Sequence, residues 1–291
     1  MKVLLAEVNI SEGTDQSKII QVKEALLARS DVELIDLNSD TDHNRTVFTF
    51  RGEPYAVLEG AKRLAQKAVE LIDMTTHHGS HPRMGAVDVV PFIPVKNIEI
   101  EEAVGIAKEF GRFLGGLGVP VYYYEEASHK DYRKTLVAIR KGQYEGLAEK
   151  MKDPDWIPDE GPVNFIPKSG ATVTGVRFPL VAFNVNISTS DLEIGKKIVK
   201  AVRGATGGYQ SVRAIALTLE ERNIVQISMN LTNYEKTPIH RVFTTIKSEV
   251  ESYGLNVVGT ELVGPIPVYA LEELLRFYLR LENFSIDQIY M

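Results

Sequence analysis

The sequence predicts an α+β fold made of two duplicated ferredoxin-like (βαββαβ) subdomains with a substrate groove between them. Hydrophobic periodicity gives the order β-α-β-β-α-β once before residue 96 and again after residue 178. Between these halves, residues 153–168 contain four prolines and no periodicity, which is typical of a connection. The tetrapeptide Val-Asn-Ile-Ser ends the predicted first strand of each half, at 8–11 and 185–188. Two similar sheets that face each other leave a groove, and ligand sites favour domain interfaces.

The first half opens with a buried strand, Val3–Ile10, followed by a turn at residues 11–13. Thr14 or Asp15 can then cap a helix that runs to about Arg29. The other elements of this repeat are predicted as strands at 32–37, 45–50 and 86–95, a polar loop at 38–44 and a helix at 53–72.

Pro91 and Pro94 place the strand at 86–95 at a sheet edge or at a bulge. The first domain, 1–176, is expected to end in the proline-rich connection at about 153–168, and the second domain is 177–291. Further elements extend the first half: a helix at about 99–114, a strand at 119–124 and one or two helices at about 132–151.

The second half repeats the pattern. Ser190 or Asp191 can cap its first helix, and Pro238 suits the first turn of its second helix. The predicted strands are 179–188, 211–219, 224–231 and 255–263, and the predicted helices are 191–202, 238–253 and 268–281.

Composition excludes several classes of protein. The chain has 291 residues, 44% of them hydrophobic, so it can bury a core and is not wholly disordered. It has no cysteine, which excludes disulfides, iron–sulfur clusters and cysteine nucleophiles and fits an intracellular address. We find neither a signal peptide nor a membrane span. A net charge of −6, with no basic-aromatic strand motif, argues against a nucleic-acid partner.

The densest chemistry lies at residues 76–88, where three of the six histidines fall within five residues. Glycine and proline break any helix here, so the segment is a loop. As a metal site it would use His77, His78, His81 and Asp88 as ligands, but this spacing outside a helix makes a metal the less favoured interpretation. We favour a histidine acting as general acid or base, with Arg83 holding an anion.

Three other polar segments have two interpretations each. Residues 38–45 form either a hydrogen-bonded turn or a clamp in which Arg45 binds a carboxylate. Residues 161–170 form either a stiff linker or a site where Phe165 stacks on a ring and Lys168 meets an anion. Residues 9–13 are explained well by an ordinary strand-to-helix turn.

The run HHGSHPRMGAVDVVPFIP at residues 77–94 resembles the signature of the glutamate formimidoyltransferase family. The resemblance extends over nearly the whole chain, and its central motif is long enough to be specific. Further matches lie at 9–13, 44–46, 161–162, Phe165, Pro167, 170–172 and 262–264.

The resemblance implies transfer of a formimidoyl group between N-formimidoyl-L-glutamate and N5 of tetrahydrofolate, in histidine degradation and one-carbon metabolism. It also implies two ferredoxin-like subdomains flanking a groove, a cytoplasmic homodimer, and the stand-alone form without a cyclodeaminase domain. The family's catalytic histidine falls on His81. Its folate-binding segment falls on Gly161, Pro162, Val163, Asn164, Phe165, Ile166, Pro167, Lys168, Ser169 and Gly170.

Lys168 and Ser169 stand where one member of the family has Ser and Trp, so this chain has one aromatic ring fewer in the folate segment than that member. Arg83, Arg45 and Lys168 are candidate anchors for the carboxylates of the substrates. Asn44 and Asn9, within matched motifs, are further candidates for substrate binding. No metal and no redox cofactor is expected, and tetrahydrofolate enters as co-substrate.

In this chemistry N5 attacks the amidine carbon, and one histidine takes the N5 proton and later protonates the departing glutamate amine. Two alternatives remain open on the sequence. The chain could move a formyl group between 5-formyltetrahydrofolate and glutamate. It could also be a folate-binding module without turnover, because a fold does not fix a function.

Overall fold

The computed structural model describes residues 1–264 and 266–289. Contacts divide the chain into two compact units, Met1–Arg177 and Phe178–Met291. Each unit has its own sheet and its own hydrophobic core, and eight α-helices lie within the described residues, so the protein is α+β.

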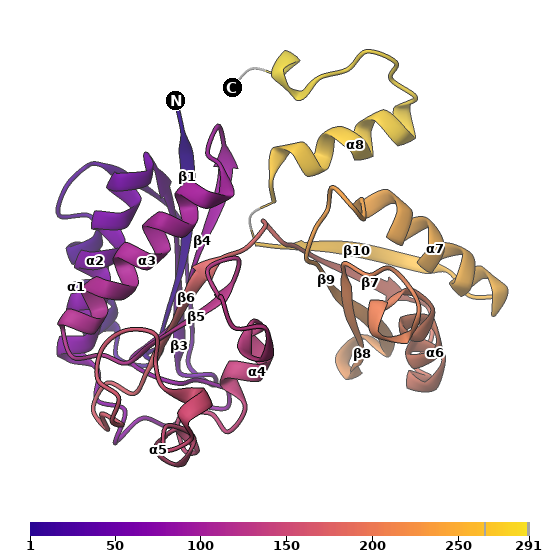
Figure 1. Ribbon diagram of the computed structural model, residues 1–291. Helices are drawn as coiled ribbons and strands as arrows, with labels where there is room; N and C mark the ends of the chain where they lie inside the picture. The colour runs from indigo at the N-terminus through magenta and orange to yellow at the C-terminus, as the bar shows by residue number, and fades with distance from the viewer. Residues whose placement is uncertain (265, 290–291) are drawn as a thin grey trace. The chain divides into compact units, whose positions relative to one another are not determined.

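The first unit contains a six-stranded sheet in the order β2-β3-β1-β4-β6-β5. Its long helices α1, α2 and α3 cover one face, and α4 lies against the other (Figure 1). Its strands are β1 (Val3–Ile10), β2 (Val32–Asp40), β3 (Arg45–Gly52), β4 (Val87–Lys96), β5 (Val121–Glu125) and β6 (Thr172–Val176). Its helices are α1 (Gln16–Leu26), α2 (Pro54–Leu71), α3 (Ile100–Gly116), α4 (Leu136–Arg140) and α5 (Leu147–Lys150).

The elements of this unit follow the sequence pattern closely at their starts. Asp15, not Thr14, is the N-cap of α1, since its side chain accepts from the amides of Ser17 and Lys18. Leu4 and the other alternate apolar residues of β1 are buried against the helices. The region predicted as one or two helices at 132–151 contains two short ones, α4 and α5.

β4 is a central strand, which corrects the edge position expected from Pro91 and Pro94. It pairs with β1 on one side and with β6 on the other. The register with β1 shifts beside Pro94, between Leu4↔Pro94 and Val3↔Lys96, in agreement with the bulge alternative. The edge prediction was wrong because β6, which supplies the second neighbour, was not predicted. Five residues long and containing Gly175, β6 gives almost no periodic signal.

The proline-rich segment 153–168 lies inside the first unit, although we expected it to connect the two halves. Val121 pairs with Glu160 in an isolated bridge, and Phe165 packs against the core on the α4 face. β6 follows this segment, so the chain returns to the first sheet before it leaves the unit.

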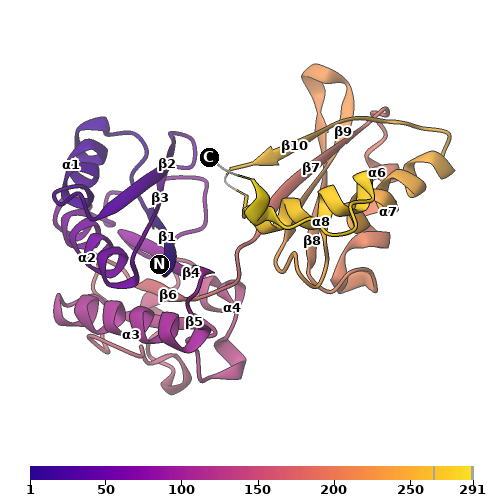
Figure 2. The same cartoon turned by 90° about the horizontal axis from the view of Figure 1, so that it is seen from above.

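The second unit has a four-stranded antiparallel sheet in the order β10-β7-β9-β8, packed against α6 and α7 (Figure 2). Its strands are β7 (Val181–Ile187), β8 (Val212–Leu219), β9 (Ile224–Leu231) and β10 (Val257–Val263). Its helices are α6 (Leu192–Val202), α7 (Ile239–Ser252) and α8 (Val268–Leu279). With the strands of each repeat numbered in chain order, both sheets contain the neighbour order fourth, first, third, second.

Candidate active site

The loop that joins α2 to β4, residues 73–86, carries the histidine cluster and is called the histidine loop below. Backbone hydrogen bonds fix both of its ends to the segment before β6. The Met74 amide donates to the Lys168 carbonyl at 2.9 Å, and the Ala86 amide donates to the Ser169 carbonyl at 2.8 Å. A Cβ on Gly85 would lie 2.5 Å from the Ser169 carbonyl oxygen, so this approach requires glycine.

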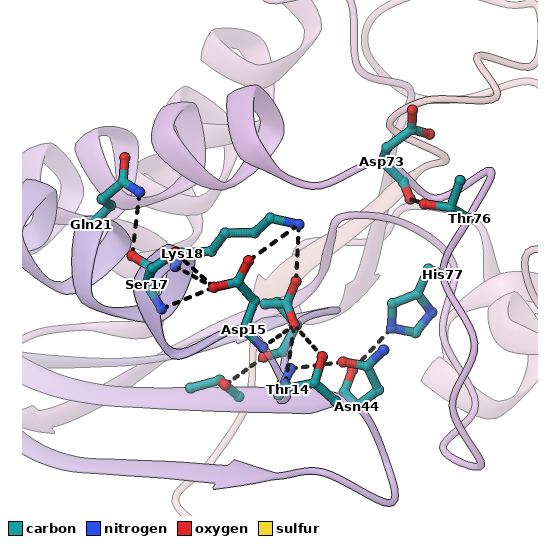
Figure 3. Close-up of polar contacts among 12 residues, drawn as sticks. Thr14, Asp15, Ser17, Lys18, Gln21, Asn44, Asp73, Thr76 and His77 are labelled. Carbon is teal, nitrogen blue, oxygen red and sulfur yellow. Dashed lines mark hydrogen bonds and ion pairs between the residues drawn. The ribbon is translucent and has the colours of Figure 1, made fainter.

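Asn44 joins the histidine loop to the turns around it (Figure 3). Its backbone is left-handed, with φ of 48°. Its Oδ1 accepts from the Gly13 amide at 2.9 Å, and its Nδ2 donates to the His78 carbonyl at 2.8 Å. Its own carbonyl lies 3.0 Å from Nε2 of His77. Both polar groups of the Asn44 side chain are therefore engaged in holding the loop.

His77 is a buried structural histidine with a defined tautomer. Nε of Arg83, which can only donate, lies 3.2 Å from Nδ1 of His77. Nδ1 is then the acceptor, so Nε2 carries the proton and donates to Asn44. Burial lowers the pKa of His77, which favours this neutral form.

Arg83 is also fully engaged. Its guanidinium donates two hydrogen bonds to the Glu145 carboxylate, at 2.7 and 3.0 Å. The Arg83 carbonyl accepts from the Tyr144 amide at 2.9 Å. Arg83 was predicted to hold an anion, and the anion it holds here is the carboxylate of Glu145.

His81 differs from His77 in its bonding. Its Nδ1 is buried and has no hydrogen-bond partner. Its ring meets the ring of His43 edge-on, with 5.8 Å between centroids. Burial, then the positive charges of Arg45 and Arg140, lower the pKa of His81 to about 4. At neutral pH the imidazole is therefore neutral, and its Nδ1 has no partner among the described residues.

Two arginines and one carboxylate complete the site. Nη2 of Arg45 donates to Oδ1 of Asn9, a buried side chain that also donates to the Glu7 carbonyl at 3.0 Å. Asp88 is buried; it accepts from the Met84 amide at 2.9 Å and from Nη2 of Arg140. Nε of Arg45 and Nε of Arg140 are buried without a partner.

Several of these side chains, Arg140 not among them, line one narrow pocket with almost no free volume. The structure thus brings together His81 and three predicted substrate-binding residues, Asn44, Arg45 and Arg83; Asn9 reaches the group through Arg45. The pocket is lined by Ser11, His43, Asn44, Arg45, His77, His81, Arg83 and Asp88.

The predicted folate segment, residues 161–170, adjoins the histidine loop at its C-terminal end. Phe165 lies 5.5 Å from the ring of Tyr144, and the Tyr144 hydroxyl donates to the Pro167 carbonyl at 2.8 Å. Val163 is exposed, and Nζ of Lys168 donates to the Glu70 carbonyl at 3.3 Å. None of residues 161–170 lines the His81 pocket.

The metal alternative gains no support from the geometry. His77 is committed to Arg83 and Asn44, and Asp88 is committed to Arg140 and Met84. In the described part of the chain, no three histidine, cysteine, aspartate or glutamate side chains are grouped to hold a metal ion. Among the same residues, no helix is long and apolar enough to cross a membrane.

Arg140, Tyr144 and Glu145 were missed by the sequence reasoning. They lie on and after α4, more than 50 residues from the histidine loop, in a stretch without a recognisable motif. The available signal was Asp88: a carboxylate inside an apolar strand requires a cation from elsewhere. That argument predicts a partner but not which arginine supplies it.

Comparison with known proteins identifies the same family as the sequence motifs do, over nearly the whole chain. The family model for the N-terminal subdomain of the formiminotransferase domain matches residues 3–177, and the formiminotransferase domain model matches residues 182–289. A glutamate formimidoyltransferase of Streptococcus pyogenes serotype M1 is 45% identical, over 95% of this chain and 93% of its own length. One from Thermoplasma acidophilum is 42% identical, over 95% and 92%.

The formimidoyltransferase-cyclodeaminase of Gallus gallus is also 45% identical, over 96% of this chain but only 52% of its own length. The match to the shorter, stand-alone enzymes is thus nearly end to end, and the match to the bifunctional enzyme covers about half of it. The chain belongs to the formiminotransferase family.

Proposed function

We propose that this protein is a glutamate formimidoyltransferase, a one-carbon transferase acting between N-formimidoyl-L-glutamate and tetrahydrofolate. Two relatives of similar length carry this name and share more than 40% of its residues. N5 of tetrahydrofolate attacks the amidine carbon and forms a C–N bond. The tetrahedral intermediate then releases L-glutamate and leaves 5-formimidoyltetrahydrofolate. Tetrahydrofolate is the co-substrate, and the step belongs to histidine degradation and one-carbon metabolism.

His81 is the proposed general base and acid. The observation that supports this role is its free, buried Nδ1 in a pocket whose other histidines, His43 and His77, are bonded within the protein. As base it takes the proton that N5 loses on attack, and as acid it gives that proton to the departing amine. His77 is unsuited to this role, since both of its ring nitrogens are bonded within the protein.

Residues 161–170 are the proposed folate-binding segment. Support comes from the hydrogen bonds that join the end of this segment to the histidine loop, which carries His81. Holding tetrahydrofolate there places it beside the base, and proximity supplies part of the rate enhancement. Three of the residues predicted to bind the glutamate substrate can be compared. Arg45 keeps an N–H group that donates to none of the described residues, whereas Asn44 and Arg83 act through the loop they hold.

The finer architecture is also a proposal. We infer that domains 1–176 and 177–291 are duplicated ferredoxin-like subdomains that flank a substrate groove. The shared strand order of the two sheets supports the duplication. A cytoplasmic homodimer that uses only small-molecule substrates, with neither nucleic acid nor membrane as partner, follows from the family resemblance and completes the proposal.

The test is a transfer assay with purified protein and two donor–acceptor pairs. With N-formimidoyl-L-glutamate and tetrahydrofolate we expect turnover, followed as 5-formimidoyltetrahydrofolate in the ultraviolet spectrum. Turnover only with 5-formyltetrahydrofolate and glutamate would show a formyltransferase instead. If neither pair turns over while folate binds, the protein is a folate-binding module.

A further inference from the structure

Several arginines and their partners surround the His81 pocket. Among the described residues that line it or pair with those that do, Arg83 is neutralised by Glu145, and His43 is paired with Asp40 at 2.9 Å. Two guanidinium groups remain, those of Arg45 and Arg140, with one carboxylate, Asp88, between them. Asp88 is the carboxylate that directly pairs with Arg140, while Glu7 and Asp40 also act electrostatically on Arg45.

The two arginines are held in place without using all their donors. Asn9 takes one Nη of Arg45, and Asp88 takes one Nη of Arg140. Each Nε–H is buried and donates to nothing. A buried donor without a partner costs about 1–3 kcal/mol, so two of them beside one pocket indicate that a ligand acceptor completes the set.

Arg140 is fixed by a second device at the end of α4. Nζ of Lys150 donates to the carbonyls of Ala138, Ile139 and Lys141, at 3.3, 2.5 and 2.7 Å. This ammonium satisfies the last carbonyls of the helix. The helix end that carries Arg140 is therefore anchored, and the guanidinium is pre-organised rather than loose.

We propose that Arg45 and Arg140 together form the receptor for a carboxylate of the glutamate donor beside His81, with Asp88 holding Arg140 in place. No motif of the sequence assigned a role to Arg140. The inference deepens the proposed function and rests on it for the identity of the donor. A carboxylate matches the site because its two oxygens can each accept from a guanidinium.

Carboxylate binding to Arg45 and Arg140 explains how the pKa of His81 changes between the free and the donor-bound protein. Arg45 and Arg140 face His81 together with His43 and Asp88, and their charge favours neutral imidazole in the free protein. A bound carboxylate cancels part of that charge. The pKa of His81 then rises toward its ordinary value of about 6.5, so the imidazole accepts the N5 proton only once the donor is seated.

The direct test uses glutarate, a dicarboxylate without amine or formimidoyl group, and the full-length protein. Imidazole resonances of His81 are assigned with His81→Gln and titrated by NMR with and without glutarate. We expect glutarate to raise the pKa of His81 by one unit or more in the wild type. An unchanged titration at saturating glutarate would overturn the proposal.

Variants then assign the effect to residues. In Arg140→Gln we expect the free-protein pKa of His81 to rise, and both glutarate affinity and the KM for the donor to worsen by about 10- to 100-fold, with the KM for tetrahydrofolate changed less than about twofold. Arg51→Gln is the matched control, since Arg51 is an exposed arginine of β3 paired only with Glu33. Equal behaviour of the two variants would contradict the proposal.

Two further readouts keep the result interpretable. Arg140→Lys keeps the charge and is expected to restore part of the glutarate affinity, which separates loss of the receptor from loss of folding. Glutarate binding and the His81 titration need no turnover. If both behave as expected while no formimidoyl transfer occurs, the proposed function fails and the carboxylate receptor stands. If the protein transfers the formimidoyl group but glutarate has no effect, the proposed function stands and the carboxylate receptor fails.

Discussion

The two units end their first strands in the same way and then diverge. In the first unit the Ser11 amide donates to the Ala86 carbonyl, and in the second the Ser188 amide donates to the Asn256 carbonyl, both at 2.9 Å. The turn before the third strand ends in a left-handed asparagine in both, Asn44 with φ of 48° and Asn223 with φ of 50°. The connection before the fourth strand, however, is residues 72–86 in one unit and only 253–256 in the other.

The polar groups around the matched strand ends also differ. Asn9 and Asn186 are matched by the shared tetrapeptide, yet Asn9 accepts from Arg45 and Asn186 accepts from Gln226. By strand register, Ile224 stands in the second unit where Arg45 stands in the first. The shared scaffold positions the strand ends, and in the first unit the long histidine loop brings His81 close to Arg45 of β3 and Arg140 of α4.

The largest expected effect on stability comes from breaking the Asp88–Arg140 pair, for which the second unit has no counterpart among the described residues. Asp88→Ala leaves the Arg140 guanidinium without its carboxylate in a largely buried position and should cost about 3–5 kcal/mol. Urea unfolding followed by fluorescence of Trp156, the only tryptophan, reports on the first unit alone. An unfolding midpoint unchanged from wild type would refute the role given to this pair.

The next largest effect is expected where the histidine loop packs against the β2–β3 turn. A Cβ on Gly79 would lie 2.3 Å from the His43 carbonyl oxygen, so Gly79→Ala should push the loop off the β2–β3 turn, costing about 1–3 kcal/mol and most of the activity. Gly259→Ala in β10 is the matched control, because its nearest neighbour would be 3.9 Å away. Both variants are compared by transfer assay and by urea unfolding. Similar losses of activity and stability in the two variants would show that the close contact at Gly79 is not required.

A smaller effect is expected for the link between the histidine loop and the folate segment. Tyr144→Phe removes the hydroxyl that donates to the Pro167 carbonyl and should raise the KM for tetrahydrofolate by about 3- to 10-fold, from about 1 kcal/mol of hydrogen bonding. The KM for the glutamate donor should stay the same. Equal changes in both KM values would argue against a separate folate segment.

The last effect is absent at neutral pH and concerns acid stability. The pKa of His81 is lowered to about 4, against about 6.5 in the unfolded chain. Below pH 6.5 the unfolded histidine binds a proton that the folded one does not bind until about pH 4, so the folded state loses stability as pH falls through this range. His81→Gln should flatten that pH dependence in urea unfolding of the first unit. An unaltered slope between pH 6.5 and 4 would contradict it.

Sequence reasoning reached most elements of the fold because their periodicity is local. The α1 stripe and the β1 alternation, for instance, need no information from elsewhere. β6 was missed, since a short strand buried between two parallel neighbours has no alternation to show, and the place of β4 was misjudged with it.

For the site, the histidine loop stood out by composition, and His81 by resemblance. What could not be predicted is how each side chain is occupied. That Arg83 is bound by Glu145 and that Arg140 reaches Asp88 depend on contacts between segments more than 50 residues apart. A sequence shows which groups are present, and only the folded chain shows which of them remain free.

The central claim, that transfer chemistry belongs to the histidine loop of the first unit, is tested most directly by comparing His81→Ala with His240→Ala, the only histidine of the second unit. Formimidoyl transfer to tetrahydrofolate is measured at saturating substrates, with and without added imidazole. We predict that kcat falls by about 10²-fold or more in His81→Ala, is partly rescued by imidazole, and stays within about twofold of wild type in His240→Ala. Retained turnover in His81→Ala would contradict the account.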